Sequence, residues 1–292
     1  MIQTWNAGAE RVFGYPAETA IGRHISLVIP PDRIADAKSK GRLILRKTAN
    51  TYYFWMNIRE APFNKLKVRQ AVNYALDRKA LQTLVWGGLG RPTQNVLPPT
   101  YPSYRKLNLY PHNLTKAKTL ITQAGAKGAK VTVWTRNVSD AVTAAQYYTS
   151  LLNQIGLDAS LNVLPRATYY TTIGNVNTHA QTGWARWLED YPHPLDWFDV
   201  LLNGNRITDQ DNNNFAWYKN KKTDAQIENL KKAPILTPAV NARWAKVEKQ
   251  IMQRAPWAPW SNRVFPEFFS RNMSCIHIQL LYGIDLARLC KK

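Results

Sequence analysis

The chain has 292 residues, a formal net charge of +20 at pH 7 and 45% hydrophobic residues. This length allows one large domain or two ordinary ones with an ample core, and the lack of any run of about 18 apolar residues excludes a transmembrane helix. The basic excess permits contact with nucleic acid or an anionic membrane surface. The Lys and Arg residues are nevertheless scattered and accompany no recognition motif, so we expect only a salt-sensitive attraction to polyanions, without sequence preference.

The first 34 residues form a segment of their own. Ala9, Val12 and Phe13 give a short apolar helical face, and Gly14 suits its C-terminal end. The run WNAGAERVFGYPAETAIGR closely resembles the opening of a PAS sensor domain, of which it covers about a third. So short a piece buries little apolar surface, and we therefore interpret residues 1–34 as a PAS-like fragment without a sensing role. A PAS-linked sensor is the alternative.

The N-terminus also lacks a basic region followed by an apolar one, which predicts no secretory signal and a cytoplasmic location for the chain as written. Residues 35–50 are mostly polar and basic, and we interpret them as a linker that leads into a strand. The aromatic run 52–57 favours β structure. Apolar residues then recur at helical spacing and predict an amphipathic helix over 67–76. Asp77 is placed to cap a second short helix that runs through Leu84.

Alternating helices and strands follow. A helix begins at Leu114 and stops at Gly125, which suits the residue after a helix. Residues 129–136 alternate as a strand, residues 140–155 form another amphipathic helix, and the period-two pattern at 157–163 predicts a second strand. This order and spacing imply βαβ units, so the sequence predicts an α/β fold.

The stretch from Thr182 to Gly204 concentrates aromatic and acidic residues. It is predicted as a strand ending near Trp187, an irregular turn imposed by Pro192 and Pro194, and a helix from about Leu195. Aromatic walls beside a carboxylate at a strand end suit a cleft for a small polar or cationic ligand. The same tryptophans would equally serve as core residues, and the pattern alone leaves both interpretations open. Beyond this stretch, we expect helices at 223–232 and 238–255 and an extended segment at 255–260.

Two motifs resemble those of the family 5 extracellular solute-binding proteins, the peptide, nickel and oligosaccharide receptors of ABC importers. The first is residues 57–81, NIREAPFNKLKVRQAVNYALDRKAL, and the second is W-x-x-D-Y-P-x-P at 187–194. The resemblance covers about residues 42–292. It implies an incomplete periplasmic-binding-protein-like type II fold, with the second lobe and the return segment in residues 51–292. It also implies binding of a peptide or another small polar solute, with weakened affinity because much of the first lobe is missing.

The resemblance further implies a site, partners and a location. Asp190 is expected to face a ligand ammonium, flanked by Trp184, Trp187 and Tyr191. We expect the ligand-binding residues to be Trp184, Arg186, Trp187, Asp190 and Tyr191. The implied partners are the ligand and an importer permease, the implied state is a monomer, and the implied location is the periplasm or the cell surface. No cofactor is expected.

Catalytic and metal-binding patterns are missing from the sequence. It has no G-x-S-x-G, H-E-x-x-H or glycine-rich phosphate loop, and its histidines lack ligand spacing. We therefore expect no enzyme activity and no metal. The two cysteines, Cys275 and Cys290, could form a disulfide in an oxidising compartment or remain as two buried thiols, and both alternatives stay open.

Overall fold

The computed structural model describes residues 10, 16–22, 43–269, 273–279 and 283–291. Within the segment likened to a PAS domain it describes a single short helix, α2 (Ala17–Ala20). Most of the remainder of that segment lies outside the described residues, as do residues 35–42 of the predicted linker. None of the described helices has both the length and the apolar character needed to cross a membrane.

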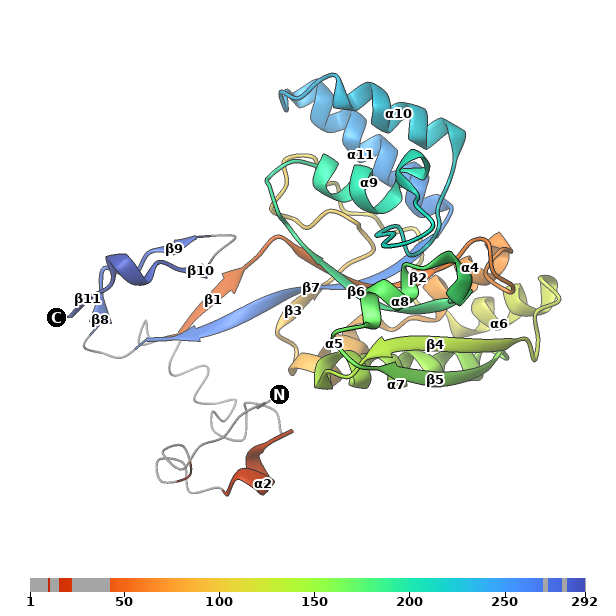
Figure 1. Cartoon of the computed structure of the whole chain (residues 1–292), viewed down its shortest axis with the longest axis horizontal. Helices are drawn as coiled ribbons and strands as arrows, with labels where there is room; N and C mark the ends of the chain where they lie inside the picture. The colour runs from red at the N-terminus through yellow and green to blue at the C-terminus, as the bar shows by residue number, and fades with distance from the viewer. Residues whose placement is uncertain (1–9, 11–15, 23–42, 270–272, 280–282, 292) are drawn as a thin grey trace.

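A seven-stranded mixed sheet organises the chain (Figure 1). Its strand order is β1-β7-β2-β6-β4-β5, and β3 pairs with β7. The pairs β4–β5 and β4–β6 are parallel, and the other pairs are antiparallel. The strands are β1 (Leu43–Lys47), β2 (Asn50–Met56), β3 (Gly90–Pro92), β4 (Lys130–Arg136), β5 (Asp158–Leu164), β6 (Thr182–Leu188) and β7 (Trp257–Phe268).

Four helices and one apolar core cover one face of this sheet. They are α4 (Leu66–Ala75), α5 (Arg78–Trp86), α6 (Leu114–Gln123) and α7 (Ser139–Gln154). The side chain of Asp77 accepts a hydrogen bond from the backbone N–H of Ala80 at 2.9 Å, and α5 ends at Gly87 with φ +60°. In the core the rings of Phe54 and Tyr148 stack with centroids 3.9 Å apart. The predicted helices and strands of this region are confirmed.

The other face packs against a second core, built largely from α9 (Leu195–Leu202), α10 (Lys221–Lys231) and α11 (Pro238–Gln253). Figure 1 shows these three helices gathered above the sheet. The helices of this side are α8 (Tyr169–Ile173), α9 (Leu195–Leu202), α10 (Lys221–Lys231) and α11 (Pro238–Gln253). Thr237 caps α11 by accepting a hydrogen bond from the N–H of Val240, and Phe198 stacks on Trp244 at 5.5 Å. The predicted mixed α/β fold is thus confirmed, with a core on each face of the sheet.

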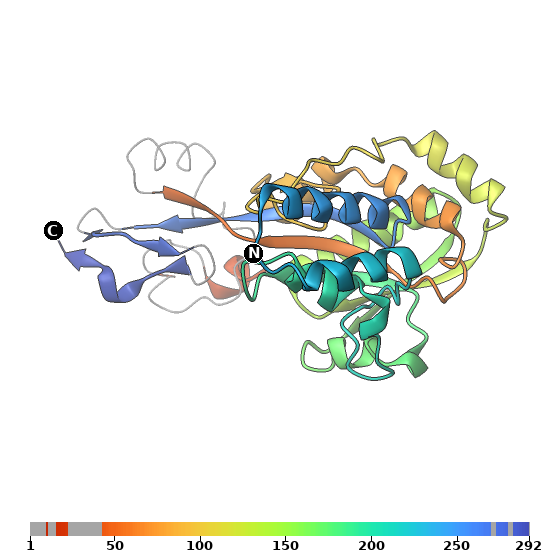
Figure 2. The ribbon, with the colours of Figure 1, turned by 90° about the horizontal axis from the view of Figure 1, so that it is seen from above.

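A two-stranded arm extends from the body (Figures 1 and 2). β1 runs antiparallel to the second half of β7, from Leu43 opposite Phe268 to Lys47 opposite Val264. The linker predicted over 35–50 is therefore wrong for residues 43–47, which form β1 because their backbone pairs with the distant β7, and for Asn50, which begins β2 opposite Leu188 of β6. Short strands lie beside the arm: β8 (Met273–Ser274), β9 (Ile278–Gln279), β10 (Gly283–Ile284) and β11 (Cys290–Lys291).

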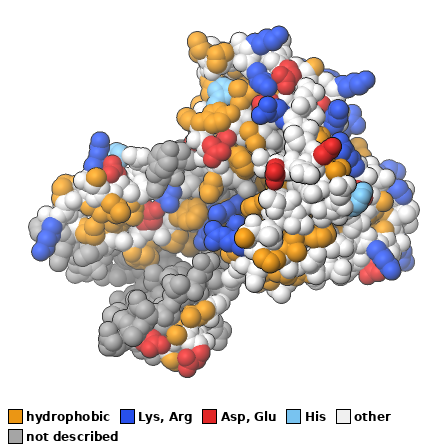
Figure 3. Space-filling view, in the orientation of Figure 1, with side chains coloured by type: hydrophobic (Ala, Val, Ile, Leu, Met, Phe, Trp, Pro, Cys, Tyr) orange, Lys and Arg blue, Asp and Glu red, His pale blue; other side chains and the backbone are white. Residues whose placement is uncertain are grey.

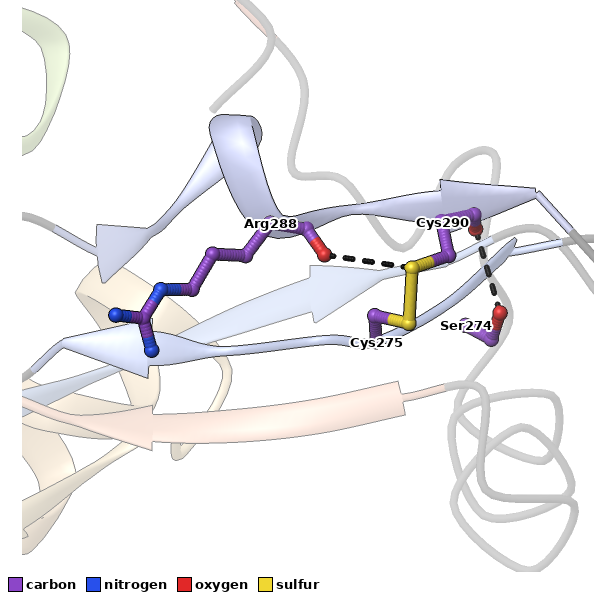
Figure 4. Close-up of a disulfide and its surroundings, with 4 residues drawn as sticks. All are labelled: Ser274, Cys275, Arg288 and Cys290. Atoms are coloured by element: carbon purple, nitrogen blue, oxygen red, sulfur yellow. Dashed lines mark hydrogen bonds between the residues drawn. A yellow bond between two sulfur atoms is a disulfide. The ribbon is translucent and has the colours of Figure 1, made fainter.

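A disulfide joins the ends of this last region. The sulfur atoms of Cys275 and Cys290 are bonded, and β8 and β11 pair beside them (Figure 4). Of the two alternatives left open by the sequence, the structure contains the disulfide.

Candidate functional site

The parallel strands place several loops at one edge of the sheet. Because β4, β5 and β6 run in the same direction, their carboxyl ends meet at this edge, where open α/β sheets usually bind ligands. Arg136 ends β4 just before α7, Arg166 follows β5, and Asp190 follows β6. We call this region the strand-end edge.

Arg136 is the most unusual residue at this edge, because it is a buried cation. It is 6% exposed, and no described salt bridge includes it. Its guanidinium carbon lies 4.5 Å from the ring centroid of Trp184 and 5.9 Å from that of Tyr170. Its Nε is buried without a hydrogen-bond partner among the described residues. A buried charge without a counterion is costly, and contact with aromatic faces offsets about 0.5–2 kcal/mol of that cost.

Two further arginines add positive charge to this region. They are Arg186 on β6 and Arg263 on β7. Arg186 donates a hydrogen bond to the hydroxyl of Tyr52 at 3.2 Å. The guanidinium of Arg263 lies 4.6 Å from the ring centroid of Phe265, and its Nη1 is 3.6 Å from Oδ2 of Asp140 at the start of α7. Figure 3 shows basic side chains grouped at the middle of the view, where β6 and β7 run in Figure 1.

The pKa of Tyr170 and the ion pairing of Asp140 both show the excess of positive charge in this region. Burial raises the pKa of Tyr170, while the positive charges of Arg136 and Arg186 act in the opposite direction. Among the described residues, Asp140 is the only acid in a salt bridge with one of the three arginines, and its other oxygen, Oδ1, is buried without a partner. The strand-end edge therefore has a surplus of positive charge beside aromatic rings, which suits a ligand that carries a carboxylate.

The structure separates two of the residues expected to flank Asp190. Side chains alternate along β6, so Trp184 and Arg186 point to one face of the sheet and Trp187 points to the other. Trp184 is fully buried in the core of the α4–α7 face, whereas Trp187 packs against the second core. Our expectation that both tryptophans flank Asp190 is wrong, because they are three residues apart on an extended strand.

The turn after β6 holds Asp190 through another carboxylate. Oδ2 of the buried Asp196 accepts hydrogen bonds from the indole N–H of Trp187 at 3.1 Å and from the backbone N–H of Asp190 at 3.0 Å. Burial is the main cause that raises the pKa of Asp196 to about 6. The side chain of Asp190 is exposed and has no described hydrogen bond or ion pair, and the neighbouring Tyr191 is 45% exposed. Asp190 and Tyr191 are thus accessible, on a turn that Asp196 fixes.

The sequence did not predict the arginine cluster, by which we mean Arg136, Arg186 and Arg263. Arg136, Asp140, Tyr170 and Arg263 come from four separate segments, which only the folded sheet brings near Arg186. A usable signal existed for one of them, since Arg136 is a charged residue that ends a predicted parallel strand. Among the described residues no group of three or more His, Cys, Asp and Glu could hold a metal ion.

Comparisons with known proteins agree on one family. Residues 22–209 match the model of "Bacterial extracellular solute-binding proteins, family 5 Middle". This match begins earlier than the resemblance we expected from residue 42, so it includes residues 22–34 of the segment likened to a PAS domain. The chain is 31% identical to the Heme-binding protein A of Haemophilus influenzae over 236 residues, which are 77% of this chain and 41% of that protein.

Other relatives have similar coverage. The chain is 28% identical to the Glutathione-binding protein GsiB of Escherichia coli strain K12, over 76% of this chain and 44% of that protein. Two solved structures share the fold. The Clavulanic acid biosynthesis oligopeptide binding protein 2 has a TM-score of 0.80 and 22% identity, over 88% of this chain and 49% of that one. A dipeptide binding protein from Pseudoalteromonas sp. SM9913, in complex with Met-Leu, has a TM-score of 0.75 and 22% identity, over 90% and 52%. The chain thus spans less than half the length of these curated relatives.

Proposed function

Because the chain belongs to the bacterial extracellular solute-binding proteins of family 5, we propose that it binds a peptide or another small zwitterionic solute for delivery to an ABC importer. The observation that carries this proposal is the buried Arg136, a cation with aromatic neighbours and no carboxylate partner among the described residues. Relatives named for glutathione and for a dipeptide support a peptide-like ligand. A carboxylate is the chemical group that such a cation accepts best.

The two ends of the ligand have different proposed partners. Its carboxylate pairs with Arg136, with Arg186 adding positive charge, and its ammonium pairs with the exposed Asp190 beside Tyr191. Trp184 supports Arg136 from the core instead of contacting the ligand, and Trp187 holds the turn through Asp196. A charge-assisted pair of this kind contributes about 1.5–3 kcal/mol, so each end changes affinity by about 10- to 150-fold.

The remaining parts of the proposal follow from the family and the disulfide. The family consists of solute-binding proteins, and we propose that this chain likewise binds its solute without chemical change. Disulfides persist in oxidising compartments, so the Cys275–Cys290 bond supports a place outside the cytoplasm. We propose the periplasm or the cell surface, a monomeric state, and a permease as the receiving partner.

The test compares a free dipeptide with its C-terminal amide by isothermal titration calorimetry. The wild-type chain should bind Met-Leu more tightly than Met-Leu amide, because the amide cannot form an ion pair with Arg136. The Arg136→Gln variant should lose about 10- to 150-fold in affinity for the acid and should no longer distinguish acid from amide.

Arg166→Gln is the matched control, since Arg166 is an exposed arginine at the same edge with no described hydrogen bond or salt bridge. It should leave both affinities unchanged. The amino end is tested in the same way with Asp190→Asn and an N-acetylated dipeptide. Absence of dipeptide binding, or equal affinity of the wild-type chain for acid and amide, would contradict the proposal.

A further inference from the structure

Basic residues are unevenly distributed, and one segment holds almost no acid. Between residues 61 and 139 the chain has thirteen Lys and Arg and a single acidic residue, Asp77. Arg69, Arg78 and Arg136 are buried within this segment, which leaves ten exposed cations. They are Lys65, Lys67, Lys79, Arg91, Arg105, Lys106, Lys116, Lys118, Lys127 and Lys130.

Five of these lysines lie on or beside one pair of helices, α4 and α6. Nζ of Lys65, just before α4, donates a hydrogen bond to the carbonyl of Ala124 at the end of α6, at 2.8 Å. Nζ of Lys116, near the start of α6, donates to the hydroxyl of Tyr74 near the end of α4, also at 2.8 Å. The two helices are therefore antiparallel neighbours, and Lys67, Lys118 and Lys127 are the other exposed lysines on these helices and on the turn after α6. We define the lysine face as Lys65, Lys67, Lys116, Lys118 and Lys127.

The lysine face lacks compensating carboxylates. None of its members forms a salt bridge with a described residue. Three acidic residues lie closest to it along the chain or the sheet. Asp77 caps α5, Glu60 pairs with His179, and Asp158 lies opposite Lys130 in the strand register. By contrast, Lys231 on α10 does have acidic partners, since it contacts Asp199 and Glu228. In Figure 3 basic side chains line the right-hand edge of the view, where Figure 1 shows α4 and α6.

The lysine face also lacks an apolar anchor. The large hydrophobic side chains exposed among the described residues are Ile21, Leu84, Val163, Leu188, Tyr191, Ile235, Phe268 and Leu286. None belongs to α4, to α6 or to the turn that carries Lys127. Protein interfaces depend on buried aromatic or aliphatic anchors, whereas attraction to lipid headgroups needs only clustered positive charge.

We propose that the lysine face docks the protein on the anionic headgroups of a membrane surface. Clusters of four to eight Lys and Arg attract anionic lipids in this way, and each cation near the surface strengthens association about fivefold. The disulfide supports an oxidising compartment, where a membrane is a more available polyanion than nucleic acid. This docking is independent of which solute the strand-end edge binds, and it would keep the protein close to the membrane.

The test measures co-sedimentation of the full chain with phospholipid vesicles. The chain should bind vesicles that contain phosphatidylglycerol and should not bind pure phosphatidylcholine vesicles. About 1 M salt should abolish binding, because the screening length then falls to about 3 Å. The triple variant Lys67→Gln, Lys118→Gln, Lys127→Gln removes three cations whose side chains make no described hydrogen bond, and it should weaken association about 100-fold.

A second triple variant controls for net charge. Lys232→Gln, Lys246→Gln and Lys249→Gln change exposed lysines near α10 and on α11 by the same total charge, and should weaken association less than about fivefold. Equal losses in the two triples would overturn the proposal, since they would indicate a general response to net charge. It would also be overturned by binding that ignores phosphatidylglycerol, or by binding to double-stranded DNA without binding to the anionic vesicles. Thermal unfolding of each variant checks that it folds.

Discussion

Replacing Asp196 by Asn should change the pH dependence of stability in a defined direction. The wild-type carboxyl has a pKa of about 6 in the folded chain against about 3.9 in an unfolded one. The folded state therefore binds more protons, and the stability contributed by this group increases as pH falls from 7 to 5. With these two values the gain between pH 7 and pH 5 is about 1.3 kcal/mol. Asn cannot titrate, so Asp196→Asn should lack this gain.

The assay is urea denaturation of both proteins at pH 5, 6, 7 and 8. Subtracting the variant from the wild type at each pH cancels the other titrating groups, including the buried Glu248, whose pKa burial raises to about 7. The difference in the free energy of unfolding should change by about 1.3 kcal/mol in favour of the wild type on going from pH 7 to pH 5. Asp211→Asn, on an exposed loop, serves as the control. A difference that stays constant with pH, or that changes in the opposite direction, would refute the reasoning.

Three further variants test the packing and the disulfide. Phe54→Ala should cost about 3–5 kcal/mol in a urea titration, because Phe54 is fully buried and stacked on Tyr148; a loss below 1 kcal/mol would argue against this core. Gly183→Ala should lower the melting temperature, since the added Cβ would overlap the carbonyl oxygen of Trp134 and lie 2.9 Å from the ring of Trp55. The double change Cys275→Ser and Cys290→Ser opens a loop with a sequence separation of 15 and should destabilise the C-terminal region by about 3 kcal/mol. Limited proteolysis should then cleave this region first, and identical cleavage rates with and without the disulfide would contradict that prediction.

Local patterns predicted the helices and strands well. The spacing of Val68, Ala71 and Val72 predicts α4, and all three residues are buried in the structure. Asp77 caps α5 as expected, because a cap depends on residues two or three positions away. Apolar spacing and helix caps depend on residues within one or two helical turns, so both can be predicted without knowledge of the rest of the fold.

Long-range pairing was not predictable in this way. Residues 43–47 looked like part of a linker, yet Arg46 lies beside Glu267, which is 221 positions later in the sequence. The arginine cluster has the same origin. Arg136 becomes a neighbour of Tyr170, and Arg263 a neighbour of Asp140, only after the sheet and its helices assemble. The prediction that Asp190 faces the ligand rests on a motif within one turn, whereas the surroundings of Asp190 belong to distant segments and were not predicted.

The position of β2 has a consequence for how the chain reaches this fold. All seven residues of β2 are buried, and the strand pairs with β6 on one side and with β7 on the other. β7 begins at Trp257, about 200 residues after β2 ends. During synthesis one edge of the buried strand β2 therefore stays unpaired until β7 has been made. Such high contact order slows folding and prolongs the exposure of aggregation-prone surface. We therefore expect efficient production of this protein to depend on chaperones that shield β2 until β7 has been synthesised.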